Sequence, residues 1–234
     1  MNQIISQHGW GLDSHVWITF RDQFINNNWI WQDNERGYYN KNSKTYIWRK
    51  DNSNKQIRML ICHSLGTQLI KKNIRLEATH IVLINSFYNF IPKRRLERKY
   101  ILRTLNLMKK KMENNQFNTM LDEFIKNSLS PNDIDFNFQK KLNLKYKNIN
   151  RSLLMHDFEK LYIEYSPEKF FSENSNLLII NSKKDKILHQ SAHDDFIKMI
   201  NDNKIKKNII ELERQGHLPE KINLFEIIQK WLHN

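Results

Sequence analysis

Three residue types that together can form a nucleophilic hydrolytic site occur in the order Ser64, Asp185 and His217. Ser64 lies in the segment MLICHSLG (residues 59–66), where an apolar run ends in a serine between small residues. This resembles the G-x-S-x-G elbow, which exposes a serine hydroxyl between a strand and a helix, with Cys62 in place of the first glycine. Taken alone, the segment fits an active serine or an ordinary strand-to-helix turn.

A serine nucleophile needs a base that accepts its proton and an acid that orients the base. Asp185 follows the strand-like run 177–181, and His217 follows the run 208–212, so both are expected in loops at strand ends. Asp185 could instead be a solvated turn residue or a helix N-cap, and a chain with nine histidines places some by chance. The order of the three residues favours His217 as the base and Asp185 as its partner.

The turn around Ser64 and the loop after the first predicted strand could supply two amides to an oxyanion hole. The amide of Leu65 directly follows the serine, and Trp10 lies between glycines in HGWGL (residues 8–12). A plain glycine turn with a packing tryptophan is the alternative. Cys62 is expected to be a buried thiol rather than a nucleophile. His63 is not expected to take part, because adjacent side chains on such a turn diverge.

The elements that must position these residues alternate between strand and helix. Strands are predicted over 3–7, 29–31, 57–62, 80–84, 177–181 and 208–212, and helices over 14–26, 65–73, 191–201 and 224–233. This alternation predicts an α/β fold with a mostly parallel central sheet and helices on both faces.

Residues 92–166 carry only helical patterns, over 93–113, 117–129, 136–144 and 151–165. We therefore expect a core made of 1–90 and 167–234 and an all-helical cap, 91–166, inserted in it.

Composition bounds the function classes. The 234 residues, 39% of them hydrophobic, suit one large domain, and no apolar run is long enough to span a membrane. One cysteine allows no intrachain disulfide, and with no recognisable leader peptide it favours the cytoplasm. The sequence offers no nucleic-acid motif, metal-ligand cluster or phosphate loop, so neither cofactor nor nucleic acid is expected.

The net charge of +13 is concentrated in part on one predicted helix. Arg95, Lys99 and Arg103 are spaced i, i+4, i+8 and share a helix face, while Glu97 is the one acid between Pro92 and Met112. Such a face either binds an acidic partner or is simply solvated.

At this point the motifs resemble a family. HGWGLD (8–13) followed by VW (16–17), HSLG (63–66), Asp185 and GHLP (216–219) are similar to capped α/β-hydrolases over nearly the whole chain. Within that group they look most like the pimeloyl-[acyl-carrier protein] methyl ester carboxylesterases of biotin synthesis. The resemblance implies that Ser64, His217 and Asp185 hydrolyse a carrier-bound acyl methyl ester without a cofactor.

The resemblance also implies roles around the substrate. Trp10 would contact the substrate, and Phe124, in a stretch similar to the family's substrate-facing cap helix, would contact the acyl chain. The acidic acyl carrier protein would be held by Arg95, Lys99 and Arg103. A general carboxylesterase or thioesterase for small acyl substrates and a non-catalytic binding protein with the same fold remain alternatives.

Overall fold

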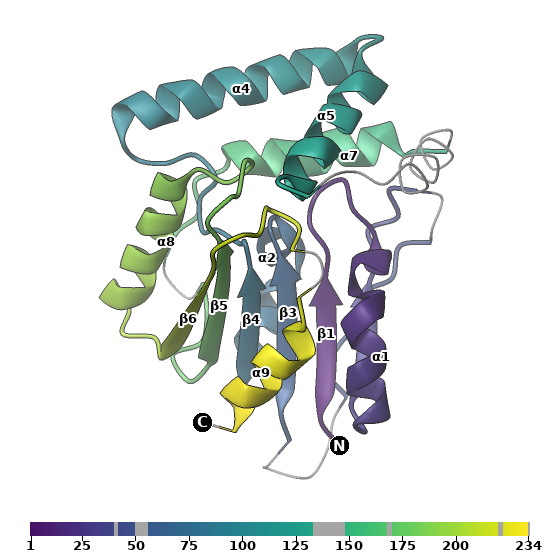
Figure 1. Ribbon diagram of the computed structural model, residues 1–234, viewed down its shortest axis with the longest axis vertical. Coiled ribbons are helices and arrows are strands. Elements are labelled where there is room, and N and C mark those ends of the chain that lie inside the picture. The colour runs from purple at the N-terminus through teal and green to yellow at the C-terminus, as the bar shows by residue number, and fades with distance from the viewer. Residues whose placement is uncertain (40–41, 50–55, 133–147, 168–169, 220–221, 234) are drawn as a thin grey trace.

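Six strands of the computed structural model form one parallel sheet, which confirms the predicted fold class (Figure 1). The structure describes residues 1–39, 42–49, 56–132, 148–167, 170–219 and 222–233. The strand order is β2-β1-β3-β4-β5-β6. The strands are β1 (Gln3–Gln7), β2 (Ile30–Asn34), β3 (Arg58–His63), β4 (His80–Ile84), β5 (Asn176–Ser182) and β6 (Lys207–Leu212).

The central strands are apolar on both faces because helices cover both sides of the sheet. On one face, Ile61 of β3 and Ile180 of β5 pack with α1 (Ile18–Asn26), which follows the 3-10 turn η1 (Ser14–Trp17), and with α9 (Leu224–Leu232). On the other face, Leu60 and Ile179 pack with α3 (Lys72–Glu77) and α8 (Gln190–Asp202). The period-2 alternation of the strands thus divides the core into two layers.

The helix expected over 65–73 is interrupted, which corrects that prediction. It is divided into α2 (Gly66–Leu69) and α3, because Ile70 has an extended backbone with ψ of 144°. Because of the break, neighbouring apolar residues pack in different cores: Leu69 packs with residues of the upper helices, whereas Ile70 and Ile74 pack on the face of the sheet that α3 and α8 cover.

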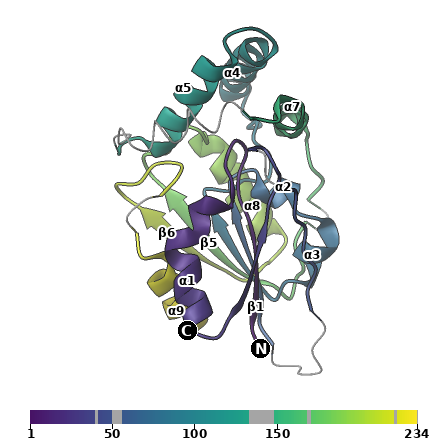
Figure 2. The same ribbon diagram turned by 90° about the vertical axis from the view of Figure 1, so that its right-hand side faces the viewer.

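Among the described residues, three helices lie across the carboxyl ends of the strands, above the sheet in Figures 1 and 2. They are α4 (Arg95–Glu113), α5 (Phe117–Leu129) and α7 (Arg151–Phe158), and we call them the cap helices. The helix expected to reach residue 165 continues past α7 only as the 3-10 turn η2 (Glu159–Tyr162). The expected helix 136–144 lies outside the described residues.

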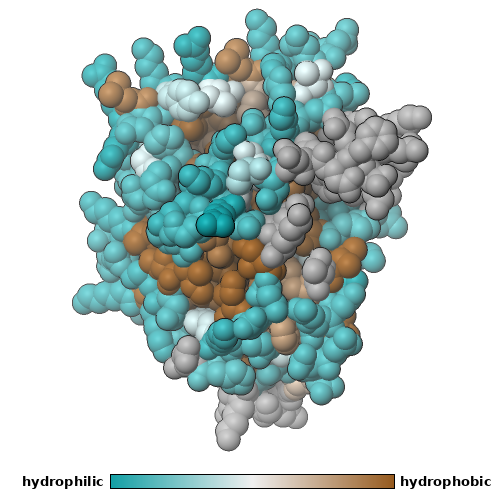
Figure 3. All heavy atoms as spheres, in the orientation of Figure 1, coloured by the Kyte–Doolittle hydropathy of each residue, from teal (hydrophilic) through white to brown (hydrophobic). Residues whose placement is uncertain are grey.

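The surface differs between the cap helices and the sheet. In Figure 3 the upper helices are largely hydrophilic, and apolar side chains gather below them at the level of the sheet. Among the described residues, no helix combines the length and apolar character needed to cross a membrane.

The strand order reverses between β1 and β3, which are neighbours in the sheet although β2 lies between them in the chain. In open parallel sheets, the crevice outside the carboxyl ends of the strands at such a reversal is where ligands bind. The loops after β1 and β3 carry Trp10 and Ser64, so the fold places both residues beneath the cap helices.

Candidate active site

Ser64 occupies a strained turn directly after β3. Its φ of 53° lies in the left-handed region, which a serine seldom adopts, and its amide donates to the Ile84 carbonyl at 3.0 Å. A Cβ on Gly66 would come within 2.5 Å of the Gln7 carbonyl oxygen, so only glycine lets the turn pack this closely on β1. The local sequence therefore forms the elbow that its small residues predict.

The structure brings Ser64, His217 and Asp185 into one hydrogen-bonded chain. Nε2 of His217 lies 2.8 Å from Oγ of Ser64, and Nδ1 of His217 lies 2.7 Å from Oδ2 of Asp185. Because an ionised carboxylate only accepts hydrogen bonds, Nδ1 carries the proton and Nε2 is free to accept the serine hydroxyl proton. This is the arrangement a general base needs.

Asp185 is held as a carboxylate by its surroundings. The side chain is 8% exposed, and its Oδ1 accepts the amides of Ile187 at 2.7 Å and Leu188 at 2.9 Å. Burial by itself would raise the pKa of Asp185, but His217 and these two amides outweigh burial and lower that pKa below its ordinary value. The carboxylate can therefore orient His217 throughout the neutral range.

The loop that carries His217 is packed against the end of cap helix α5. An ideal Cβ on Gly216 would lie 1.8 Å from the Ser130 carbonyl oxygen, so no larger residue fits there. The amide of Leu218 donates to the Ser128 carbonyl at 2.8 Å. The position of His217 thus depends on α5 as well as on the sheet.

Trp10 and Leu65 lie beside Ser64, and all three line the same cavity. Within the described part of the chain, neither backbone amide donates to another protein group, so both remain available to a substrate oxygen. The Trp10 side chain is fixed by its Nε1, which donates to the Leu154 carbonyl of α7 at 2.8 Å. Its ring makes an edge contact with Phe124, with the ring centroids 5.0 Å apart.

An apolar cavity of about 330 Å³ opens above Ser64 between the core and the cap helices. Phe124 and Trp10 line it, as expected for substrate contacts, and Lys111, Glu123 and Lys186 are among its polar lining residues. The other apolar lining residues are Leu65, Phe90, Tyr100, Ile101, Leu105, Leu107, Met108, Met120, Phe158, Leu161 and Ile187. The space beside the serine therefore suits an apolar group.

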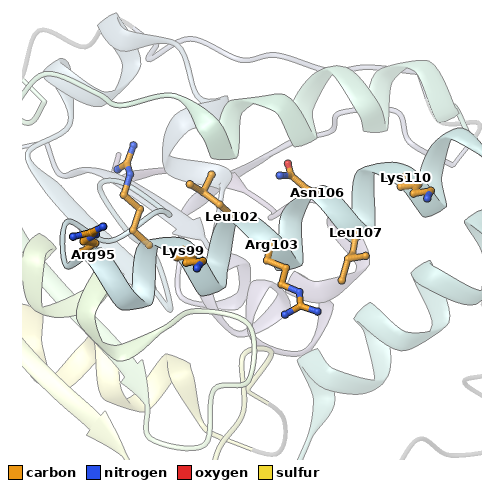
Figure 4. Close-up of a pocket in the computed structure, with 8 residues that line it drawn as sticks. Arg95, Lys99, Leu102, Arg103, Asn106, Leu107 and Lys110 are labelled. Atoms are coloured by element: carbon orange, nitrogen blue, oxygen red, sulfur yellow. The ribbon is translucent and has the colours of Figure 1, made fainter.

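Arg95, Lys99 and Arg103 lie outside this cavity, along the outer face of α4 (Figure 4). They lie on an open surface of the protein whose residues all come from that helix, and we call it the basic face. All three side chains are exposed, and none forms an ion pair with another described residue. Within the described ranges, these three cations therefore form a face of positive charge without an acidic partner.

Two residues that were not expected to take part in the site contact the His217 loop. The His63 side chain was expected to diverge from that of Ser64, and its Nε2 lies 2.8 Å from the His217 carbonyl oxygen. Asn85, directly after β4, donates to the same oxygen from Nδ2 at 2.7 Å. The available signal was positional, since Asn85 is a polar residue at the carboxyl end of a buried strand.

Cys62 lies at the buried end of β3 with no exposed surface, and burial raises the pKa of its thiol to about 12. The thiol is buried, as predicted, and its raised pKa keeps it protonated at neutral pH. In the ranges that the structure describes, no group of three or more His, Cys, Asp or Glu residues could hold a metal ion.

No protein-family model matches the sequence, and no curated protein sequence is significantly similar to it. Solved structures nevertheless share the fold along essentially the whole chain. A bromoperoxidase from Bacillus anthracis has a TM-score of 0.69 at 16% identity, covering 99% of this chain and 91% of its own. An esterase from Exiguobacterium antarcticum has a TM-score of 0.68 at 14% identity, covering 100% and 90%.

An enol-lactonase from Burkholderia xenovorans LB400 is a third structure of the same kind, with a TM-score of 0.62 at 10% identity, covering 99% of this chain and 90% of its own. These identities are too low to indicate a shared substrate. What the similarity and the sheet topology establish together is that this chain has the α/β-hydrolase fold.

Proposed function

We propose that this protein is a serine hydrolase that cleaves acyl esters, with Ser64 as nucleophile, His217 as base and Asp185 as orienting acid. The observation that carries the proposal is the hydrogen-bonded chain of these three side chains, with distances of 2.7 and 2.8 Å, which ends at Ser64 in the lining of an apolar cavity. One of the structural neighbours is itself named an esterase.

In the first half-reaction, Oγ of Ser64 attacks the ester carbonyl carbon while Nε2 of His217 takes the hydroxyl proton. The carbonyl oxygen becomes an oxyanion, which the amides of Leu65 and Trp10 would stabilise. The intermediate then breaks its bond to the alkoxy oxygen, and His217 gives that oxygen the proton, so an alcohol leaves. Ser64 retains the acyl group as an ester.

In the second half-reaction, His217 removes a proton from water, whose oxygen attacks the acyl-enzyme carbonyl. Collapse of this second intermediate returns the proton to Oγ of Ser64 and releases the carboxylic acid. Asp185 stays ionised throughout and stabilises the imidazolium that forms twice, consistent with its lowered pKa.

The substrate that we propose is the methyl ester of a pimeloyl group carried by acyl carrier protein, which yields methanol as the alcohol. Two observations support a carrier-bound acyl group. The α4 cations, which form no ion pair with another described residue, suit a strongly acidic carrier, and Leu107 lies both on the basic face and in the lining of the cavity above Ser64. An acyl chain attached to a carrier on α4 could therefore enter the cavity beside that residue.

A carboxylesterase or thioesterase for small free acyl substrates is the second candidate. It is favoured by the cavity volume of about 330 Å³, near the lower end of the roughly 300–1,000 Å³ typical of small-molecule sites. Such an enzyme would need no docking face for a carrier.

The nucleophile is tested by labelling with a fluorophosphonate and by turnover of p-nitrophenyl esters. Ser64→Ala is expected to abolish labelling and to lower kcat by roughly a millionfold, because it removes the attacking atom. Cys62→Ala is the matched control, since the buried thiol is expected to do no chemistry. Failure of the wild type to be labelled would refute the serine hydrolase.

The carrier is tested with the triple variant Arg95→Ala, Lys99→Ala, Arg103→Ala. We expect kcat/KM to fall at least tenfold on the carrier-bound methyl ester, and to do so less at high salt, while short soluble esters are unaffected. Replacement of Lys72, Lys198 and Lys206 by Ala removes the same charge elsewhere. Equal activity of both triple variants on the carrier-bound ester would favour the second candidate.

A further inference from the structure

The backbone carbonyl of His217 accepts hydrogen bonds from two side chains that come from different strands. Nε2 of His63, the last residue of β3, lies 2.8 Å away, and Nδ2 of Asn85, which follows β4, lies 2.7 Å away. Nδ2 of Asn85 also lies 3.1 Å from the Gly216 carbonyl oxygen. The backbone of the proposed base is thus held at two successive residues.

The His63 ring is buried although one of its nitrogens has no hydrogen-bond partner among the described residues, and packing alone does not explain a histidine at this position. A carbonyl oxygen only accepts, so the single proton of the neutral ring lies on Nε2, and Nδ1 has no hydrogen-bond partner among the described residues. Burial, together with the nearby His217 ring, lowers the pKa of His63 to about 3, so the ring stays neutral. An apolar ring of similar size would avoid the buried, unpaired nitrogen and the unfavourable free energy that goes with it.

Asn85 joins the same carbonyl to the strand that leads to Asp185. Its Oδ1 accepts the Ser182 amide at 2.7 Å, and its Nδ2 lies 2.9 Å from Oγ of Ser182, the last residue of β5. Asn85 has a φ of 44°, a left-handed conformation that asparagine tolerates better than most residues, and it is 1% exposed. One side chain therefore links the loops of the acid and of the base.

We propose that His63 and Asn85 are positioning residues that clamp the His217 backbone, so that its imidazole lies between Ser64 and Asp185. The inference rests on the proposed function, because it concerns the same site. Neither side chain lines the cavity above Ser64. Their loss should therefore slow the chemical step without weakening substrate binding, since small displacements of a catalytic group reduce the rate by up to about a hundredfold.

The test compares His63→Phe, which keeps a ring but removes the donor, with His63→Gln, whose amide nitrogen can occupy the place of Nε2. Each rate is measured with p-nitrophenyl butyrate and divided by the concentration of Ser64 that a fluorophosphonate titrates. We expect kcat to fall roughly 10- to 100-fold in the Phe variant, with KM unchanged, and to recover at least half of that loss, on a logarithmic scale, in the Gln variant.

Asn85→Asp is the second variant. If His63→Phe does not fold, Asn85→Asp by itself tests whether the hydrogen bonds to the His217 backbone affect kcat. It keeps the acceptor for the Ser182 amide but loses both donated bonds, so kcat should fall about tenfold at unchanged KM. If His63→Phe and Asn85→Asp have the same kcat per titrated serine as the wild type, whatever their melting temperatures, the positioning role of His63 and Asn85 is refuted. The proposed serine hydrolase activity is not affected by that result. An unlabelled and inactive wild type would overturn both.

Discussion

At the scale of single residues, the site depends on which nitrogen of His217 carries the proton. The carboxylate of Asp185 fixes that proton on Nδ1, because it can accept but not donate. The lone pair on Nε2 is thereby directed at the hydroxyl of Ser64, 2.8 Å away. In the proposed mechanism, this tautomer activates Ser64, and no property of the serine side chain itself is needed.

The tautomer leads to a prediction for Asp185→Asn. An asparagine amide can donate to Nδ1, which moves the ring proton to Nε2 and leaves no acceptor for the serine proton. We expect kcat to fall about 10⁴-fold with little change in fold or KM, measured with p-nitrophenyl butyrate. Asp194→Asn, an exposed change in α8, is the control. Similar kcat values for the two variants would refute the role of Asp185.

At the scale of elements, α5 shapes the cavity through Phe124. This side chain contacts the Trp10 ring and lines the space above Ser64. Phe124 lies on a cap helix and not on the sheet, and the His217 loop contacts the end of the same helix through Ser128 and Ser130. Truncating the Phe124 side chain can therefore change the size of the cavity while these backbone contacts of the His217 loop stay in place.

Phe124→Ala should therefore change chain-length preference. Removing the ring enlarges the cavity. We therefore expect the KM for p-nitrophenyl acetate to rise several-fold, and the ratio of the KM for longer acyl esters to the KM for the acetate to fall. Leu96→Ala, which truncates an 80% exposed side chain of α4, is the control. An unchanged series of KM values from acetate to octanoate would show that Phe124 does not limit the acyl site.

Local patterns predict the elements well and the contacts between them poorly. The alternation of apolar residues gives β1 and β4 with their observed bounds, and the helical period gives α5. The break at Ile70 is missed because the apolar pattern continues through it, while packing on two cores decides the backbone. That 91–166 forms a separate cap remains a prediction.

The same reasoning applies to the site. Ser64, Asp185 and His217 are predictable because each follows a strand in a known order. The clamp is not, since His63 lies 154 residues from His217 and Asn85 lies 132 residues from it. Such bonds depend on register and loop conformation, which single-sequence patterns do not specify.

At the scale of the whole molecule, buried charges tie the cap helices to the core. Asp157 of α7, which has no exposed surface, pairs with Arg36 through two bonds of 2.8 Å and accepts the Tyr38 hydroxyl at 2.7 Å. Glu35, which precedes Arg36 in the chain, accepts hydrogen bonds from the amides of Ser14 and Gly37 at 3.0 and 3.1 Å. These contacts lie beside the HGWG loop, so folding of the core and seating of α7 are coupled.

This network predicts a pH dependence of stability. Burial would raise the pKa of Glu35, but His8 and the two amides outweigh burial and hold that pKa well below its usual range. Because the pKa of Glu35 is lower in the folded than in the unfolded state, its ionised form stabilises the fold at pH values above the unfolded-state pKa of about 4.3. This stabilisation is lost as the pH falls toward the folded-state pKa. Glu35→Gln should therefore reduce the free energy of unfolding by about 1–3 kcal/mol at pH 7 and by less below pH 4.

Urea unfolding between pH 3 and pH 7 measures this difference, with the exposed change Glu173→Gln as the control. The wild type and the Glu35→Gln variant should converge as the solution becomes acidic, whereas the control should match the wild type throughout. A constant gap between the wild type and Glu35→Gln at every pH would mean that the charge of Glu35 does not carry the stabilisation.

The close packing of Gly216 on the Ser130 carbonyl has a consequence for engineering. In the proposed enzyme, the cap helices would determine the acyl specificity through the cavity that they line, which makes them attractive to exchange between hydrolases. Here the end of α5 also supports the loop of the base, through Ser128 and Ser130. A chimaera that replaces the cap but keeps 128–130 should retain the alignment of His217, and one that replaces these residues too should exchange specificity only at the expense of turnover.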